Sequence, residues 1–438
     1  MSELLAPAGS FEALVAAISN GADAIYLGMQ QFGARAYASN FDETELAKAI
    51  HYAHVRNVKI YVTMNTIVFE DEMENMKKMI DFLYSSNVDG VIIQDLAVFQ
   101  YVVQTYPDME AHCSTQMGID DLEGTLLFKK LGAKRVVLAR ETPIEKVKEI
   151  KKIAQIPLEI FIHGALCVSY SGNCLMSGLI GYRSGNRGRC VGSCRKEYRL
   201  LDKTNQKSYD KCYLLSMKDL NTIEHINELK TIDSLKIEGR MKEPYYVANV
   251  VARYREALDG TLTKESKDQL KKTFHRTFTK GYLFGEDKIN ITNIKKPNNY
   301  GYYIGKIKSK KQNVYELELV DTLNQNDVIR IDHNNQEINL TVVKLYDRNL
   351  NYINTAKKQC FIKLKEDCSI GDAIYKTKDY NFYQEIESSY PKEYRRFPID
   401  ITIYAYENAP LILDAVCEKI HFHYEGELLD KAKQLPTT

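Results

Sequence analysis

The chain has 438 residues, of which 44% are hydrophobic and 27% are charged, and its formal net charge is +1. This length and composition are typical of a globular protein of two or three domains. The balanced charge excludes a globally basic nucleic-acid-binding protein, so any contact with nucleic acid must depend on a local patch.

The N-terminal residues show neither the basic region nor the apolar stretch of a signal peptide. No uninterrupted apolar run approaches the ~20 residues that a membrane-spanning helix needs. We therefore expect a cytoplasmic protein without a membrane partner.

Short apolar segments alternate with amphipathic helical segments over the first 260 residues. The expected strands are residues 3–8, 24–29, 59–65, 90–95, 110–114, 135–139, 158–163 and 234–239. The clearest helices between and after them are residues 42–57, 70–87, 143–154 and 243–260. Eight parallel βα units close most naturally into a barrel, although a doubly wound open sheet is an alternative. The sequence thus predicts an α/β fold, a TIM-like (β/α)8 barrel, over residues 1–262.

Polar side chains stand where the expected strands end, which is where barrel enzymes place their active sites. We expect His163, Glu238 and Arg240 to take part in catalysis, His163 or Glu238 by moving a proton. The expected substrate-binding residues at the same strand ends and their loops are Arg35, Asn65, Gln116 and Arg140. Loops are polar in any protein, and Lys236, Glu238 and Arg240 could instead form structural ion pairs.

The seventh βα unit contains an insertion, residues 164–215, before an expected helix at residues 218–230. An insertion this long in a compact domain is usually functional, and it should lie on the catalytic face. It includes an expected hairpin at residues 198–215 and a glycine-rich basic stretch. Arg183, Asn186 and Arg187 of this stretch are candidates for contacting a phosphate chain. A solvated basic loop explains the stretch equally well.

This insertion contains four of the nine cysteines within a span of 28 residues. They are Cys167, Cys174, Cys190 and Cys194. In a cytoplasmic chain such clustering indicates metal binding or redox chemistry. Zinc knuckles pair cysteines that have two to four residues between them. This spacing suits Cys190 and Cys194 better than Cys167 and Cys174. The wider spacing favours an iron–sulfur cluster over zinc, and free thiols are the remaining alternative.

The chain after residue 262 changes character. Residues 263–295 are expected to form a helical connector, and residues 296–385 contain short strands at regular spacing, typical of a small all-β barrel domain. Residues 396–438 read as the start of a further C-terminal β module that has too few strands to stand alone. We therefore expect this module to continue in a longer protein.

Several segments resemble the collagenase-like peptidase family, peptidase family U32, over about residues 1–260. The most specific is "EIFIHGALCVSYSGNCLMS" at residues 159–177, supported by "ELLAPAGS", "STQMG", "GNRGRCVGSCRKEY" and "LKIEGRMK". The resemblance implies an RNA-modifying enzyme that uses prephenate as co-substrate and carries a 4Fe-4S cluster. The implied product is 5-hydroxyuridine at the tRNA wobble position or 5-hydroxycytidine in large-subunit ribosomal RNA, with a slight preference for ribosomal RNA.

The resemblance implies that Cys167, Cys174 and Cys190 are cluster ligands. Many relatives have a further cysteine directly after the "KDL" motif, where this chain has Asn221. We expect Cys194 to be the fourth ligand, with Cys212 as the alternative.

Two functions of other classes remain open. A collagenase-like peptidase could use Cys167 and His163 as a nucleophile and base, but the chain has neither an H-E-x-x-H nor a G-x-S-x-G motif. A non-catalytic protein could use the cluster for RNA binding or redox sensing. For the hydroxylase, the two carboxylates of prephenate suit arginine recognition, with Arg35, Arg140, Arg183 and Arg240 as candidates.

Overall fold

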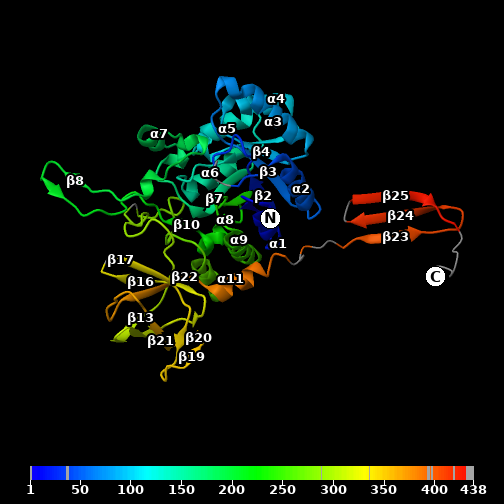
Figure 1. Ribbon diagram of the computed structural model, residues 1–438. Helices are drawn as coiled ribbons and strands as arrows, with labels where there is room; N and C mark the ends of the chain where they lie inside the picture. The colour runs from blue at the N-terminus through cyan, green and yellow to red at the C-terminus, as the bar shows by residue number, and fades with distance from the viewer. Residues whose placement is uncertain are drawn as a thin grey trace. The chain divides into compact units, whose positions relative to one another are not determined.

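The computed structural model describes residues 2–35, 39–287, 289–334, 336–391, 395, 398–417 and 420–430 (Figure 1). The chain divides into two units, residues 1–392 and 393–438. None of the helices in the described part of the chain is long and apolar enough to cross a membrane.

The first unit begins with a closed parallel barrel. Each of its eight strands pairs in parallel with two neighbours, and the last strand pairs with both the seventh and the first. The strands are β1 (Glu3–Pro7), β2 (Ala24–Leu27), β3 (Lys59–Met64), β4 (Gly90–Ile93), β5 (Glu110–Cys113), β6 (Arg135–Val137), β7 (Leu158–Ala165) and β11 (Ser234–Ile237). The predicted TIM-like barrel is confirmed, and the open sheet is excluded.

Helices follow the strands as the sequence pattern predicts. They are α1 (Phe11–Ser19), α2 (Glu43–His54), α3 (Met73–Ser85), α4 (Leu96–Thr105), α5 (Leu122–Lys130), α6 (Ile144–Ala154) and α9 (Pro244–Asp259). Asp42 caps α2, because its carboxylate accepts a hydrogen bond from the amide of Glu45, while the Glu45 carboxylate accepts one from the amide of Asp42. The apolar faces of the helices pack against the outward-facing strand residues in one large core.

The prediction of a helix at residues 218–230 is wrong for the first half of this segment. Residues Asp219–Asn221 form β10, which pairs antiparallel with the end of β7, and only η6 (Ile223–His225) and α8 (Ile226–Leu229) are helical. β7 extends beyond its barrel neighbours to Ala165, so its free upper edge offers hydrogen bonds that the 219–221 backbone takes. β12 (Phe278–Thr279) then adds to β10. In the insertion, β8 (Leu201–Asp202) and β9 (Lys207–Ser208) form the predicted hairpin.

Residues after the barrel form antiparallel sheets around a second core. The larger sheet contains β13 (Tyr302–Lys311), β14 (Val314–Leu319), β16 (Val328–His333), β17 (Gln336–Thr341), β18 (Leu345–Tyr346), β19 (Tyr352–Ile353), β21 (Gln359–Lys363) and β22 (Ala373–Lys378). A smaller sheet pairs β15 (Leu323–Asn324) with β20 (Thr355–Ala356). The predicted all-β architecture is confirmed, whereas the predicted domain boundaries stay a prediction.

Short helices lie on either side of this region. α10 (Lys264–Asp268) and η7 (Gln269–Lys272) precede it, and α11 (Tyr380–Glu387) follows it. Phe382 and Tyr383 of α11 pack with Ala16 and Ala248 of the barrel helices.

The second unit is a three-stranded antiparallel sheet of β23 (Asp400–Tyr404), β24 (Pro410–Cys417) and β25 (Ile420–Leu428). Residues 396–397, 418–419 and 431–438 of the expected C-terminal module lie outside the described residues.

The barrel interior contains buried charges below the strand ends. The carboxylate of Glu159, which is fully buried, lies 2.7 Å from Lys236 Nζ and 3.2 Å from Arg135 Nη1. Arg135 also bonds Glu3 at 2.6 Å. Burial opposes ionisation of Glu159, but the charges of Lys236 and Arg135 outweigh it and lower the pKa of the carboxyl. Each of these buried side chains therefore stays charged because its neighbours carry the opposite charge.

We expect Glu159→Gln to lower the free energy of unfolding by about 3–5 kcal/mol, because it leaves Lys236 buried without a counter-charge. Urea denaturation followed by circular dichroism measures the change. The matched control is Glu149→Gln, on the exposed side of α6, which should change stability by less than about 0.5 kcal/mol. Equal effects of the two substitutions would show that the interior charges are not coupled.

Candidate functional site

A cavity of about 380 Å³ opens at the carboxyl ends of the barrel strands. We call it the reaction cavity. Its walls come from strand ends on one side and from the cysteine-rich insertion on the other. Among the predicted site residues, those that line it are Arg35, Asn65, Gln116, Arg140, Cys167, Cys174, Cys190, Cys194, Glu238 and Arg240.

Glu238, just after β11, is held by two arginines from distant parts of the chain. Its carboxylate lies 2.7 Å from Arg140 Nη2 and 3.3 Å from Arg35 Nη2. Burial raises the pKa of Glu238, but Arg35 and Arg140 outweigh burial and the pKa is lowered. Glu238 is therefore ionised at neutral pH, so it can accept a proton or orient the arginines but has no proton to donate.

Arg240 is a fixed, buried cation at the same wall. Its guanidinium donates to the Thr63 hydroxyl and, at 3.0 Å, to Asn40 Oδ1, and only 3% of the residue is exposed. Burial, and then the charge of Arg35, lower its pKa to about 10, so it stays charged at neutral pH. Gly28 makes this possible, because a Cβ there would lie 2.6 Å from the guanidinium nitrogens.

Two of the predicted amides meet at the rim. Asn65 Nδ2 donates to Gln116 Oε1 at 3.0 Å, while Asn65 Oδ1 accepts from the amide of Ala34 at 3.1 Å. Asn65 thereby fixes the loop that carries Arg35.

The four clustered cysteines all line the reaction cavity. Cys190 Sγ accepts hydrogen bonds from the Gly192 amide at 3.4 Å and from the Ser177 hydroxyl at 3.7 Å. In the described residues, no group of three cysteine, histidine or acidic side chains is arranged to hold a single metal ion. In a four-iron cluster each thiolate binds a different iron, so the ligands stand farther apart than around one ion. Four cysteine thiols around one cavity are a donor set of the kind that an iron–sulfur cluster uses.

Glu141 holds the loop between Cys167 and Cys174, a role that sequence reasoning missed. Its carboxylate accepts from the Ser171 hydroxyl at 2.7 Å and from the Ser171 amide at 2.9 Å. Ser171 is buried with φ of 43°, a left-handed conformation that a serine adopts only when its surroundings impose it. The only signal in the sequence was an acid directly after Arg140 at a strand end.

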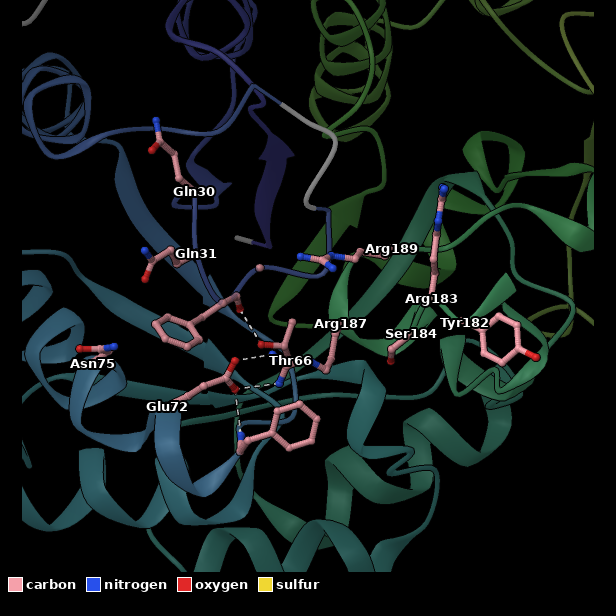
Figure 2. Close-up of a pocket in the computed structure, with 13 residues that line it drawn as sticks. Gln30, Gln31, Thr66, Glu72, Asn75, Tyr182, Arg183, Ser184, Arg187 and Arg189 are labelled. Atoms are coloured by element: carbon pink, nitrogen blue, oxygen red, sulfur yellow. Dashed lines mark hydrogen bonds and ion pairs between the residues drawn. The ribbon is translucent and has the colours of Figure 1, made fainter. Parts of the chain in front are cut away.

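The basic stretch of the insertion lies mainly beside a second cavity. Arg183 and Arg187 line that cavity and not the reaction cavity, and Arg187 forms a two-point ion pair with Glu72 (Figure 2). Asn186 instead supports a cysteine, since its Oδ1 accepts from the Cys174 amide at 3.2 Å.

The alternative fourth ligand, Cys212, and Asn221, which stands where many relatives have a cysteine, lie elsewhere. Cys212 does not line the reaction cavity; its backbone pairs with Tyr198 at the base of the hairpin. Asn221 is on β10, where its Oδ1 accepts from the Ile223 amide and from the Tyr254 hydroxyl. Cys194 lines the cavity with the other three.

Comparisons with known proteins give a consistent assignment. Residues 9–293 match the model of peptidase family U32. The chain belongs to this family. An uncharacterized protease of Methanocaldococcus jannaschii is 35% identical over 405 residues, which cover 86% of this chain and 99% of that protein.

Two further U32 relatives are named for RNA hydroxylation. The tRNA hydroxylation protein P1 of Bacillus subtilis is 37% identical over 65% of this chain and 71% of its own length. The 23S rRNA 5-hydroxycytidine C2501 synthase of Escherichia coli is 36% identical over 75% of this chain. This chain spans about half (52%) of the length of that synthase.

The sequence predicted His163 as a proton-transfer residue at the strand ends, but it lies outside the cavity there. It does not line the reaction cavity; its ring contacts Tyr246 and Tyr254 of α9 and Phe278. Simple alternation along β7 would place it inward with Phe161, but the pairing with β11 skips one residue and turns it outward. Cys167 lines the reaction cavity whereas His163 does not, which argues against a Cys–His nucleophile.

We expect the buried His163 to make this U32 protein less stable at acid pH. Burial lowers its pKa from 6.5 to about 4. Between these values unfolding takes up a proton, so the free energy of unfolding should fall by up to roughly 3 kcal/mol as the pH falls. The charges of Asp219, which raises the pKa, and His275, which lowers it, also act on His163, and both residues are unchanged in the test variant.

The measurement is urea unfolding of wild type and His163→Phe between pH 7 and 4.5. Phenylalanine keeps the ring packing, so the stability of the variant should depend less on pH. Parallel curves would contradict the assignment of the pH effect to His163.

Proposed function

We propose that this chain is an RNA hydroxylase that adds a hydroxyl group at C5 of a pyrimidine, with a 4Fe-4S cluster and prephenate as co-substrate. The observation that carries the proposal is the reaction cavity. Four cysteines and a set of fixed arginines from separate strand ends meet there, and relatives over this region are named for tRNA and rRNA hydroxylation.

The charges around the cavity suit an anionic co-substrate. Glu238 is the only carboxylate among the lining residues, whereas Arg35, Arg140 and Arg240 all face the same space. Arg240 is bonded only to neutral groups and Arg35 is partly exposed, so both can bind a carboxylate. Held in this way, a dicarboxylate such as prephenate would be fixed between the barrel rim and the insertion.

Cys167, Cys174, Cys190 and Cys194 would hold the cluster. An iron–sulfur cluster supplies one-electron chemistry that none of the lining side chains can provide. The hydrogen bonds that Cys190 Sγ accepts would help to orient it as a ligand. The surplus of cationic side chains in the lining offsets the negative charge of a cluster bound by four thiolates.

The cavity admits a base only when the base has left its stack. An unpaired loop nucleotide is therefore the natural substrate, because it loses little pairing energy on entry. Replacing the C5–H bond by a C5–OH bond is a two-electron oxidation, so the step must take its oxygen atom from an oxygen-donating oxidant. The ionised Glu238 is placed to accept the proton that C5 releases.

Cys194→Ala should remove most of the iron from protein purified without oxygen, whereas Cys212→Ala should keep it. Wild type should contain about four irons and four sulfides per chain. Iron and sulfide assays with an absorption spectrum measure the outcome. A single zinc in the wild type would contradict the cluster, and loss of iron only on Cys212→Ala would reassign the fourth ligand.

Arg240→Ala should abolish hydroxylation while keeping the fold and the iron content. Hydroxylation is measured by mass spectrometry of nucleosides from RNA of a host that lacks its own hydroxylases and expresses this chain. Glu238→Gln should also lower the yield, by about 100-fold if it acts as the base. The control is Lys130→Ala on the exposed side of α5. Absence of a new hydroxylated pyrimidine with iron-loaded wild type would reject the proposed function and favour a binding or redox-sensing role.

A further inference from the structure

We propose that the second cavity, beside the reaction cavity, binds a nucleotide adjacent to the target base in single-stranded RNA. This inference rests on the proposed function and adds to it a subsite that selects the substrate strand. The cavity has a volume of about 480 Å³. The loop after β2, the start of α3 with the loop before it, and the insertion form its walls (Figure 2).

The two cavities share a wall. In the segment 184–190, Arg189 lines the second cavity and the next residue, Cys190, lines the reaction cavity. The loop after β2 behaves in the same way, since Gly33 lines the second cavity and Arg35 the first. A strand that places one base in the reaction cavity therefore meets the second cavity with a neighbouring nucleotide.

The second cavity has a surplus of positive charge. Among the described residues, the only carboxylate that lines it is Glu72, which Arg187 binds with two bonds of 2.9 and 2.5 Å. Arg183 and Arg189 also line it, are exposed, and have no acidic partner among the described residues. Two free guanidinium groups at the mouth of a cavity suit the phosphates of a nucleic acid strand.

Aromatic rings stand at the cavity in backbone conformations that bulky residues avoid. Tyr182 is 95% exposed and has φ of 52°, and Phe32 has φ of 59°. Such strain persists where a function requires it. Phe69 is also exposed, with the guanidinium of Arg187 over its ring at 4.2 Å. Exposed rings beside free cations form the stacking surface that unpaired bases bind.

Amide side chains supply the third element of nucleotide recognition. Gln30, Gln31 and Asn75 lie on the wall opposite Tyr182 and Arg183 (Figure 2). All three amides are exposed, and none is hydrogen-bonded to another group in the described parts of the chain. An amide both donates and accepts, so it can pair with the edge of a base. In a duplex those edges and faces are already occupied, so the cavity fits single-stranded RNA.

The first test compares binding of a fluorescent seven-nucleotide oligouridylate and of uridine monophosphate by the iron-loaded full chain. Arg183→Ala/Arg189→Ala should bind the oligonucleotide about tenfold more weakly. The slope of log affinity against log salt should fall by about 1.4, as for two lost phosphate contacts. Binding of the mononucleotide should be unchanged. The matched control, the double variant Lys130→Ala/Lys152→Ala, removes two exposed charges from α5 and α6. It should change neither the affinity for the oligonucleotide nor its salt dependence.

The second test separates stacking from folding. Tyr182→Gly removes the ring and also relieves the positive φ, so it should not destabilise the chain. It should weaken oligonucleotide binding by about fivefold or more, whereas Tyr182→Phe should stay within about twofold of wild type.

Unchanged oligonucleotide affinity in both the arginine pair and Tyr182→Gly would overturn the inference. So would an equal loss of mononucleotide binding, which would assign these residues to the target base itself. If wild type hydroxylates RNA while these variants bind and hydroxylate normally, only the subsite fails. If wild type neither binds nor hydroxylates RNA, the proposed function fails and the subsite fails with it.

Discussion

Closure of the barrel is the constraint on which the site depends. β11 pairs with both β7 and β1, so the eight parallel strands must end at one rim. Arg35, Arg140 and Glu238 follow three different strands and lie far apart in the sequence, yet the rim brings both guanidinium groups within 3.3 Å of the Glu238 carboxylate. An open sheet of the same strands would leave the first and last of them at opposite edges.

Buried charges then give the rim its shape. Below it, Glu159 joins Lys236 and Arg135 inside the barrel, and above it Glu238 joins its two arginines. A buried ion is costly unless its partners stay in place, so each pair restrains the strands that carry it. The resulting cavity is rigid and cationic before any ligand binds. Such an arrangement favours an anionic ligand because little reorganisation is needed.

The insertion supplies what the barrel lacks. Four of its cysteines line the reaction cavity, while Arg183, Arg187 and Arg189 line the second cavity. Glu141 fixes its first loop to the end of β6. One chain segment thereby contributes both candidate cluster ligands and candidate strand contacts. A shift of this segment would therefore change both cavities together.

The sequence by itself determined the eight strands, most of the helices and the four clustered cysteines, because periodicity, caps and spacing are local properties. Only the tertiary structure decided which predicted residues share a cavity. His163 follows the same alternation as Phe161, but a skipped residue in the pairing of β7 with β11 turns it toward α9. Arg187 looked like a free cation until the fold placed Glu72, 115 residues away, against it. Register and long-range pairing depend on neighbouring strands and loops, and no local pattern encodes them.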